Sequence, residues 1–306
     1  MKRIKIISVV GPTASGKTAL SIEIAKRYNG EIISADSMQI YKGMDVATAK
    51  PTKEEIKGIV HHLIDNVNPE NEYSVAQYVN DARNAIIDID QRGKIPILVG
   101  GTGLYVNSLL DNVQFIESPV DDELRKRLNS LNTEELLHML CEVDKESYEK
   151  LIVEKNHKRI ARALEIFYLT GKPKSVVDRE AKSTPSPYDA IKIGLNANDR
   201  QFLYDRINMR VDSMIDMGLL DEAKKFLSMN LSSTASKAIG YKEFIPYFNG
   251  ESSLEECKDV LKMETRRYAK RQLTWFKRDK DINWFLIDLM SKDELTKKVF
   301  EIIDKG

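Results

Sequence analysis

Residues 11–18 carry the clearest chemical signal in the chain, because they read Gly-Pro-Thr-Ala-Ser-Gly-Lys-Thr and fit the phosphate-binding pattern G-x-x-x-x-G-K-[ST]. The glycines permit positive φ angles and close backbone approach, so that N–H groups, a helix start and the Lys17 ammonium converge on phosphate oxygens. The hydroxyl of Thr18 can hold Mg²⁺. The octet predicts a diphosphate or triphosphate site with magnesium, built from Gly11, Pro12, Thr13, Ala14, Ser15, Gly16, Lys17 and Thr18.

The segments on either side of the octet have the order strand, loop and helix that such a loop needs. An apolar, β-branched run over 4–10 leads into the first glycine, and a helical pattern follows the threonine. Strand-like and helix-like segments then alternate, which predicts a parallel sheet. The further predicted elements are strands over 31–35, 95–99 and 190–195 and a helix over 73–92. The predicted fold class is α/β, with a P-loop NTPase-like parallel sheet core flanked by helices.

The character of the sequence changes between 118 and 187, where charged helical segments dominate and Thr-Pro-Ser-Pro forms a stiff end. We expect this stretch to be a small all-helical domain inserted into a catalytic core made of 1–117 and 188–306. The expected helices are 121–130, 133–141, 144–153 and 157–170, and residues 199–280 are expected to be mostly helical.

The predicted strand 31–35 is followed by Asp36, for which spacing alone leaves two roles open. Ligands of open α/β sheets lie beyond the carboxyl ends of strands, so this carboxylate should lie near the phosphate loop. An aspartate after a strand is also a common helix N-cap. Strand 95–99 is followed by Gly-Gly-Thr-Gly instead of the magnesium-binding acid of an ordinary P-loop ATPase. This departure weighs against a motor or regulatory NTPase and does not exclude a small kinase.

The composition of the 306 residues allows a substantial core and gives no global electrostatic field, because 42% are hydrophobic and the formal net charge is zero. Cys141 and Cys257 are the only cysteines and indicate a reducing compartment without disulfides or a zinc finger. The four histidines lack metal-ligand spacing. No apolar run is long enough to span a membrane, and the N-terminus leads directly into a strand. We therefore expect a cytoplasmic protein without a signal peptide or membrane segment.

Basic residues cluster in three places. Residues 262–280 hold eight basic and two acidic side chains, a local charge of +6, with the basic ones on one half of a helix. This is either a solvated face over an aromatic core contact or a surface for a polyanion. The other clusters are Lys158, Arg159 and Arg162, and the pair Arg206 and Arg210. The pair can present two guanidiniums to one anion or form salt bridges along a helix.

Seven segments together resemble the tRNA dimethylallyltransferase family, also called tRNA isopentenyltransferases, and run in the family's order through nearly the whole chain. They are GPTASGKT (11–18), DSMQIYKGMD (36–45), TAKP (48–51), GGTGLY (100–105), RALE (162–165), GYKE (240–243) and KRQLTWF (270–276). The first is generic alone, but the set is specific. Eukaryotic members add a C-terminal zinc finger, for which this chain lacks the cysteines, so it resembles the bacterial form.

The resemblance implies an enzyme that transfers a dimethylallyl group from dimethylallyl diphosphate to N6 of the adenosine 3′-adjacent to the anticodon. This is position 37 of tRNAs that read codons starting with U, and diphosphate is released. Asp36 would be the general base, Thr102 would contact the reacting tRNA site, and Lys17 with an arginine would stabilise the leaving diphosphate. We select Arg206 as that arginine, with Arg210 as its rival, and Mg²⁺ on Thr18.

The implied partner is the tRNA anticodon stem-loop, whose target base must be flipped out of its stack. The family pattern places residues 37–39 against this base and its neighbours, and the helical insertion would clamp the stem-loop. The expected RNA contacts are Asp36, Ser37, Met38, Gln39, Thr102, Lys158, Arg159, Arg162, Arg266 and Lys270. We expect a monomer that needs no protein partner.

Three other functions share some of these features. A prenyltransferase acting on free AMP or ADP would have little need of two basic faces or a clamp domain. A small-molecule kinase would transfer phosphate from ATP. A noncatalytic GTPase-like RNA-binding module would read guanine, but the chain has no N-K-x-D motif.

Overall fold

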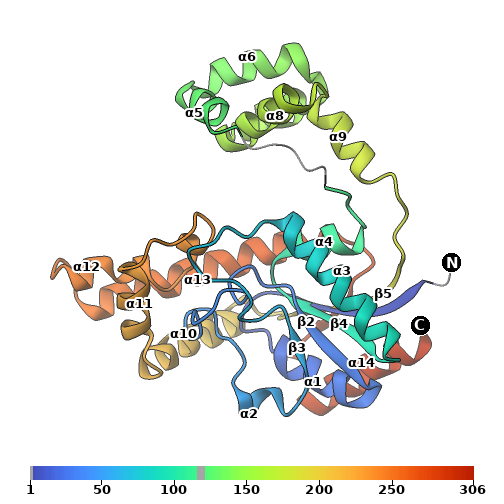
Figure 1. The fold of residues 1–306 in the computed structure, drawn as a ribbon. Helices are drawn as coiled ribbons and strands as arrows, with labels where there is room; N and C mark the ends of the chain where they lie inside the picture. Colours follow the sequence, from blue (N-terminus) through green and yellow to red (C-terminus); the bar gives the residue numbers. More distant parts are fainter. Residues whose placement is uncertain (1–2, 116–120) are drawn as a thin grey trace. The chain divides into compact units, whose positions relative to one another are not determined.

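The structure, a computed structural model, describes residues 3–115 and 121–306, and the chain forms two compact units (Figure 1). The core unit comprises the residues up to Leu110 and those from Pro187 to Gly306. The helical unit comprises Asp111–Ser186. The chain therefore leaves the core unit once and returns to complete it.

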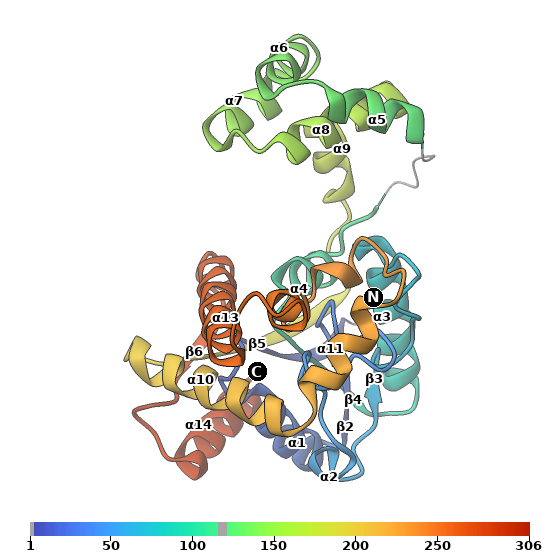
Figure 2. The same ribbon diagram turned by 90° about the vertical axis from the view of Figure 1, so that its left-hand side faces the viewer.

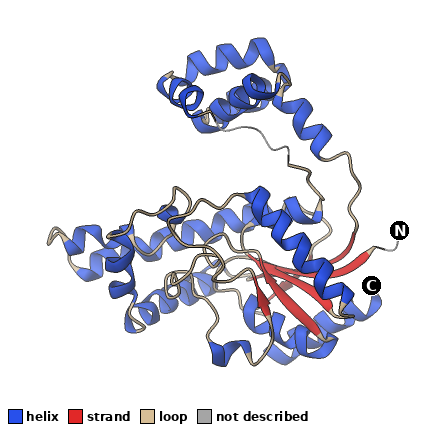
Figure 3. Ribbon diagram, in the orientation of Figure 1, coloured by secondary structure: helices blue, strands red, loops and turns tan. Residues whose placement is uncertain are grey.

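The core unit is built on one sheet in which all neighbouring strands are parallel, in the order β3-β2-β4-β1-β5-β6 (Figure 3). The strands are β1 (Ile4–Val10), β2 (Gly30–Ser34), β3 (His61–His62), β4 (Ile95–Gly100), β5 (Tyr188–Asn196) and β6 (Asn283–Leu286). The helices are α1 (Lys17–Tyr28), α2 (Lys53–Ile56), α3 (Val75–Gln91), α4 (Gly103–Leu110), α10 (Arg200–Asp216), α11 (Leu219–Leu227), α12 (Ile245–Phe248), α13 (Leu254–Phe276) and α14 (Lys292–Lys305), with 3-10 turns η1 (Ala235–Lys237) and η2 (Lys242–Phe244). Because β2, β4 and β1 are neighbours, the loops that follow them meet at one edge of the sheet.

Side chains of β1 alternate between the two faces of the sheet, as the pleat requires. Ile6 and Val10 pack on the face that also buries α3 and α4, whereas Ile7 and Val9 pack against α1 and α14. Figures 1 and 2 show α3 and α4 on one side of the sheet and α1 and α14 on the other. Burial on both faces explains the continuous apolar, β-branched sequence of this strand, and it gives the phosphate loop a rigid base.

The helical unit has an apolar core of its own. Leu136 and Leu140, one turn apart, pack with Ile160 and Leu164, which have the same spacing, and all four are fully buried. The helices of this unit are α5 (Asp122–Ser130), α6 (Thr133–Val143), α7 (Lys145–Glu154), α8 (His157–Thr170) and α9 (Lys174–Ala181). An independent core allows this segment to fold as a compact unit.

The α/β fold with a parallel sheet is confirmed, and the expected strands and helices lie within two residues of those observed. The sequence analysis did not predict β3, β6, α9 or α14, and the two strands are too short for periodicity to reveal. The helical unit begins at Asp111 and ends at Ser186, whereas the expected insertion ran from 118 to 187. Residues 118–120 lie outside the described residues.

Candidate active site

The loops after β2 and β4 are held together at the carboxyl edge of the sheet. The N–H of Thr102 donates to the carbonyl of Ala35 over 3.1 Å, and a Cβ on Gly100 would clash with that carbonyl. The Thr102 hydroxyl accepts a hydrogen bond from the N–H of Ser37 (3.0 Å) and donates one to the Ser37 hydroxyl (3.3 Å). These bonds fix both neighbours of Asp36 in the chain.

The loop of residues 11–18 has a backbone suited to an anion. Gly11 and Gly16 have φ angles of 144° and 90°, in the region that favours glycine. A Cβ on Gly11 would also clash with the carbonyl of Leu195 in β5. Helix α1 begins at Lys17, so the N–H groups of its first turn lack intrahelical partners and are available to phosphate oxygens. The Nζ of Lys17 donates to the carbonyl of Pro12, at 2.7 Å, within the same loop.

The electrostatics of the loop also favour an anion. The pKa of Lys17 is lowered to about 8, mainly by burial and secondly by the charge of Arg210, while the carboxylate of Asp36 opposes the change. Burial also lowers the pKa of the Arg210 guanidinium. Two partly desolvated cations beside one carboxylate make a site that a bound diphosphate would stabilise.

We expect inorganic diphosphate to bind more weakly as the pH rises from 7 to 9, because Lys17 loses its proton around pH 8. A bound anion raises the pKa of this lysine, so binding at pH 8.5 should take up about 0.7 of a proton at Lys17. Isothermal titration calorimetry in buffers of different ionisation enthalpy measures this uptake. The Lys17→Met variant corrects for protons exchanged by diphosphate itself, and equal uptake by the two proteins would contradict the expectation.

Asp36 combines the two roles that the sequence left open. Its Oδ1 accepts hydrogen bonds from the N–H groups of Met38 (2.9 Å) and Gln39 (3.4 Å), as a capping residue does. Its side chain also lines a cavity of about 390 Å³ together with Lys17, Thr18 and Arg210. One carboxylate oxygen thus holds the loop, and Oδ2 remains as a proton acceptor.

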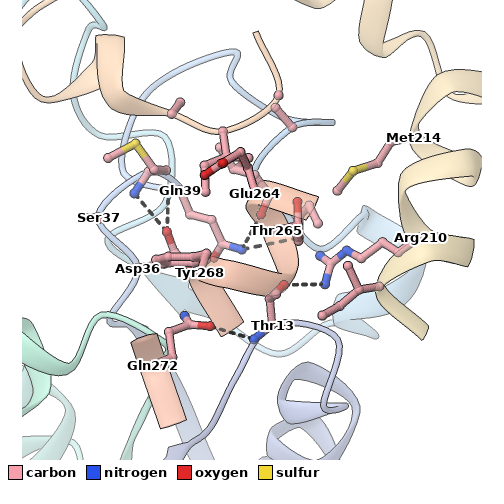
Figure 4. A pocket seen from close by; sticks show the side chains of 18 of the residues that line it. Thr13, Asp36, Ser37, Gln39, Arg210, Met214, Glu264, Thr265, Tyr268 and Gln272 are labelled. Carbon is pink, nitrogen blue, oxygen red and sulfur yellow. Dashed lines mark hydrogen bonds between the residues drawn. The ribbon is translucent and has the colours of Figure 1, made fainter. Parts of the chain in front are cut away.

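The cavity brings together residues from seven parts of the chain. Figure 4 shows Asp36, Ser37 and Gln39 on one wall, Arg210 and Met214 opposite them, and Tyr268 of α13 beside Asp36. The lining residues that sequence reasoning missed include Met214, Val211, Ala238, Ile239, Glu264, Thr265, Tyr268 and Gln272. They belong to the buried sides of α10 and α13 and to the segment around η1 and η2, where the only signal was the GYKE and KRQLTWF motifs.

Thr102 is not among the described residues that line this cavity. Its hydroxyl is engaged with Ser37, so its present contacts orient the loop that carries Asp36.

The structure distinguishes the two candidate arginines. Arg210 lines the cavity and its Nη1 donates to the hydroxyl of Thr13 over 3.3 Å. Arg206 is exposed and, together with Arg210, lines a second cavity that residues 14–18 of the phosphate loop also line. Its Nε donates to the carbonyl of Ala14 over 2.8 Å. Both arginines therefore reach the phosphate loop, and Arg210 is the one that also shares a cavity with Asp36.

A carboxylate of α11 holds the segment that follows the Asp36 loop. Glu222 accepts hydrogen bonds from three successive N–H groups, those of Asp45 (2.8 Å), Val46 (2.8 Å) and Ala47 (2.9 Å). The hydroxyl of Tyr241 donates to the same carboxylate over 3.0 Å. This arrangement fixes the wall of the cavity at Ala47, a contact that the sequence did not suggest.

The basic cluster of α8 is partly engaged within the helical unit. Arg159 pairs with Glu154 at 2.5 Å, and Arg162 pairs with Glu165 at 2.6 Å. The carboxylate of Glu165 is buried and also accepts from an arginine of α5, so Arg162 helps to neutralise a buried charge. Lys158 is exposed, and none of the ion pairs among the described residues includes it. Lys158 is therefore the residue of this cluster most available to RNA.

The basic residues of 262–280 were expected on one helix, but α13 ends at Phe276. Lys277, Arg278 and Lys280 follow the helix. Arg266 donates to the Oδ1 of an asparagine of α10 over 2.6 Å and stacks on Tyr204. A surface groove is lined by Lys270, Arg271, Thr274, Trp275 and Arg278. Cations around an aromatic ring suit a nucleic-acid strand.

Two classes of feature are missing from residues 3–115 and 121–306. No group of three or more His, Cys, Asp or Glu side chains could hold a metal ion. No helix among these residues is long and apolar enough to cross a membrane.

Comparison with known proteins connects this geometry to a family. The family model described as IPP transferase matches residues 39–279. A tRNA dimethylallyltransferase of Caldanaerobacter subterraneus subsp. tengcongensis is 48% identical over 308 residues, which cover 98% of each chain. A protein of the same name from Halalkalibacterium halodurans is 46% identical and covers 97% of this chain and 95% of its own.

Solved structures give the same result. The full-length tRNA isopentenylpyrophosphate transferase of Bacillus halodurans is 42% identical, with a TM-score of 0.74 and coverage of 98% of this chain and 96% of its own. A eukaryotic dimethylallyltransferase described as acting on tRNA is 32% identical, with a TM-score of 0.85, and covers 97% of this chain and 78% of its own.

Proposed function

Since the chain belongs to the IPP transferase family and modifies tRNA by dimethylallyl transfer, we propose that its donor is dimethylallyl diphosphate. The acceptor is N6 of the adenosine 3′-adjacent to the anticodon, position 37, in tRNAs that read codons starting with U. The observation that carries this proposal is that Asp36 and the phosphate-loop residues Thr13, Lys17 and Thr18 line one cavity. We also propose that the protein is a monomer in the cytoplasm, where its tRNA substrate is found.

The reaction breaks the bond between C1 of the dimethylallyl group and the diphosphate oxygen, which leaves with the electron pair. Lys17, Arg210 and the first-turn N–H groups of α1 stabilise the charge that develops there. The lone pair of N6 forms the new C–N bond, and one N6 proton passes to Oδ2 of Asp36. The cavity thus provides a leaving-group site and a base for the nucleophile.

Magnesium fits this site as a companion of the diphosphate. Thr18 lines the cavity, and Mg²⁺ is commonly held by one or two protein oxygens with phosphate oxygens and water. When bound, the ion would add positive charge to the leaving diphosphate. The absence of a carboxylate cluster among the described residues agrees with an ion that arrives with its ligand.

The RNA is proposed to approach from the side of the cavity that Ser37, Met38 and Gln39 line. A base in an anticodon loop can be flipped and read on its edges, which requires polar side chains around the pocket. Lys158 of the helical unit and the groove around Trp275 would hold phosphates and unstacked bases.

Charge reversal in the groove should weaken tRNA binding and its salt dependence. In the double variant Lys270→Glu, Arg278→Glu, the loss of two phosphate contacts is expected to reduce the slope of log K against log salt by about 1.4 to 1.8. Filter binding or fluorescence anisotropy with tRNA at several salt concentrations measures this slope. The double reversal Lys297→Glu, Lys298→Glu on the exposed side of α14 is the matched control. An unchanged slope would place the RNA elsewhere.

Mass spectrometry tests the proposed function directly. Unmodified tRNA that reads U-starting codons is incubated with the protein, magnesium and dimethylallyl diphosphate, and its fragments are weighed. A C5H8 gain on the adenosine 3′ of the anticodon is expected. No gain on tRNA, together with prenylation of AMP, would make the protein a free-nucleotide enzyme.

A further inference from the structure

Gln272 of α13 is a buried polar side chain that joins two loops of the site. It is 5% exposed. Its Oε1 accepts the N–H of Thr13 at 2.8 Å, and its Nε2 donates to the carbonyl of Gly101 at 3.1 Å. Figure 4 shows its carboxamide reaching Thr13 at the floor of the cavity. A helix near the end of the chain is therefore bonded both to the phosphate loop and to the loop after β4.

Two glycines on either side of Thr102 make room for this helix. A Cβ on Gly101 would clash with the Nε2 of Gln272, and a Cβ on Gly103 would clash with the ring of Trp275. Helix α13 therefore contacts the loop on both sides of Thr102. That threonine in turn holds the loop that carries the catalytic carboxylate.

We infer that Gln272 is a positioning residue that sets the separation between the leaving diphosphate and the general base, an inference that rests on the proposed function. Its carboxamide oxygen accepts a hydrogen bond from one loop, and its amino group donates one to the other. A displacement of about 1 Å between reacting groups lowers a rate by about 100-fold. Neither Thr13 nor Gly101 lines the groove proposed for RNA. The loss of Gln272 should therefore affect the chemical step more than tRNA binding.

The first variant is Gln272→Met, which keeps the length of the side chain and removes both hydrogen bonds. We expect kcat for dimethylallyl transfer to fall about 10- to 100-fold, while KM for tRNA stays within about twofold of the parent value. Gln91→Met, at the exposed end of α3, is the matched control and should leave both constants unchanged. Activities are expressed per folded molecule, so that lower stability alone does not count as a loss.

The second variant, Gln272→Glu, separates positioning from a merely structural role. The introduced carboxyl is an acceptor only when ionised, but it can accept and donate when protonated, as the carboxamide does. We expect its kcat, divided by that of the parent at the same pH, to be higher at pH 6 than at pH 8.5, because burial raises the pKa of a carboxyl and so favours its protonated form. The ratio cancels the titration of Lys17 and other shared groups.

A ratio that is flat with pH would overturn the inference, as would a kcat of Gln272→Met within twofold of the parent. If Gln272→Met does not fold, the pH ratio of Gln272→Glu decides alone. Failure of the proposed function gives a different result, because the parent chain itself would then form no prenylated tRNA. That result would overturn the inference as well.

Discussion

Asp36→Asn is expected to lower the turnover of dimethylallyl transfer about 10²- to 10⁴-fold and to leave tRNA binding unchanged. The asparagine Oδ1 can still accept the hydrogen bonds from Met38 and Gln39, so the loop should keep its shape. The amide nitrogen that replaces Oδ2 cannot take the N6 proton. Single-turnover rates at saturating donor, with a separate tRNA-binding titration, measure the two effects.

The control for this substitution is Asp90→Asn, an exposed position near the end of α3. It makes the same chemical change away from the cavity and should react at the parent rate. Near-normal turnover of Asp36→Asn would remove Asp36 as the general base. A loss of tRNA affinity as large as the loss of rate would assign Asp36 to RNA recognition instead.

Lys17→Met is expected to raise the KM for dimethylallyl diphosphate and to lower kcat, with kcat/KM for the donor falling about 10²- to 10³-fold. The methionine keeps most of the side-chain volume but removes the ammonium that would contact the leaving oxygens. The tRNA affinity should stay at the parent value, because Lys17 lies in the phosphate loop. Steady-state kinetics with each substrate varied in turn distinguishes the two.

Stability measurements complete this experiment. The pKa of Lys17 in the folded protein is lowered, so at pH 7 the burial of its charge opposes folding, and this cost decreases as the pH rises through about 8. Lys17→Met should therefore unfold at or above the parent temperature at pH 7. Lys26→Met, at the exposed end of the same helix, is the control.

In the kinetic experiment, a rise in the KM for tRNA without a change in the KM for the donor would contradict the phosphate-loop assignment.

The elements that the sequence predicted well are those whose signals are local. The octet at 11–18 specifies a turn by its glycines, and β1 and α3 show clear periodicity over a whole element. Among the elements that were missed, β3 and β6 are short edge strands whose pairing with β2 and β5 depends on distant residues. These two strands can therefore be recognised only in the folded sheet.

What the sequence by itself determined is the phosphate loop, the parallel sheet and the position of Asp36 after β2, because each follows from residue type and near-neighbour spacing. Only the tertiary structure showed which of Arg206 and Arg210 shares a cavity with Asp36. They lie one turn apart on α10, about 40° from each other around the helix, so the packing of α10 determines which one enters the cavity. The same holds for Gln272, because its role follows from two hydrogen bonds to loops that are distant in the sequence.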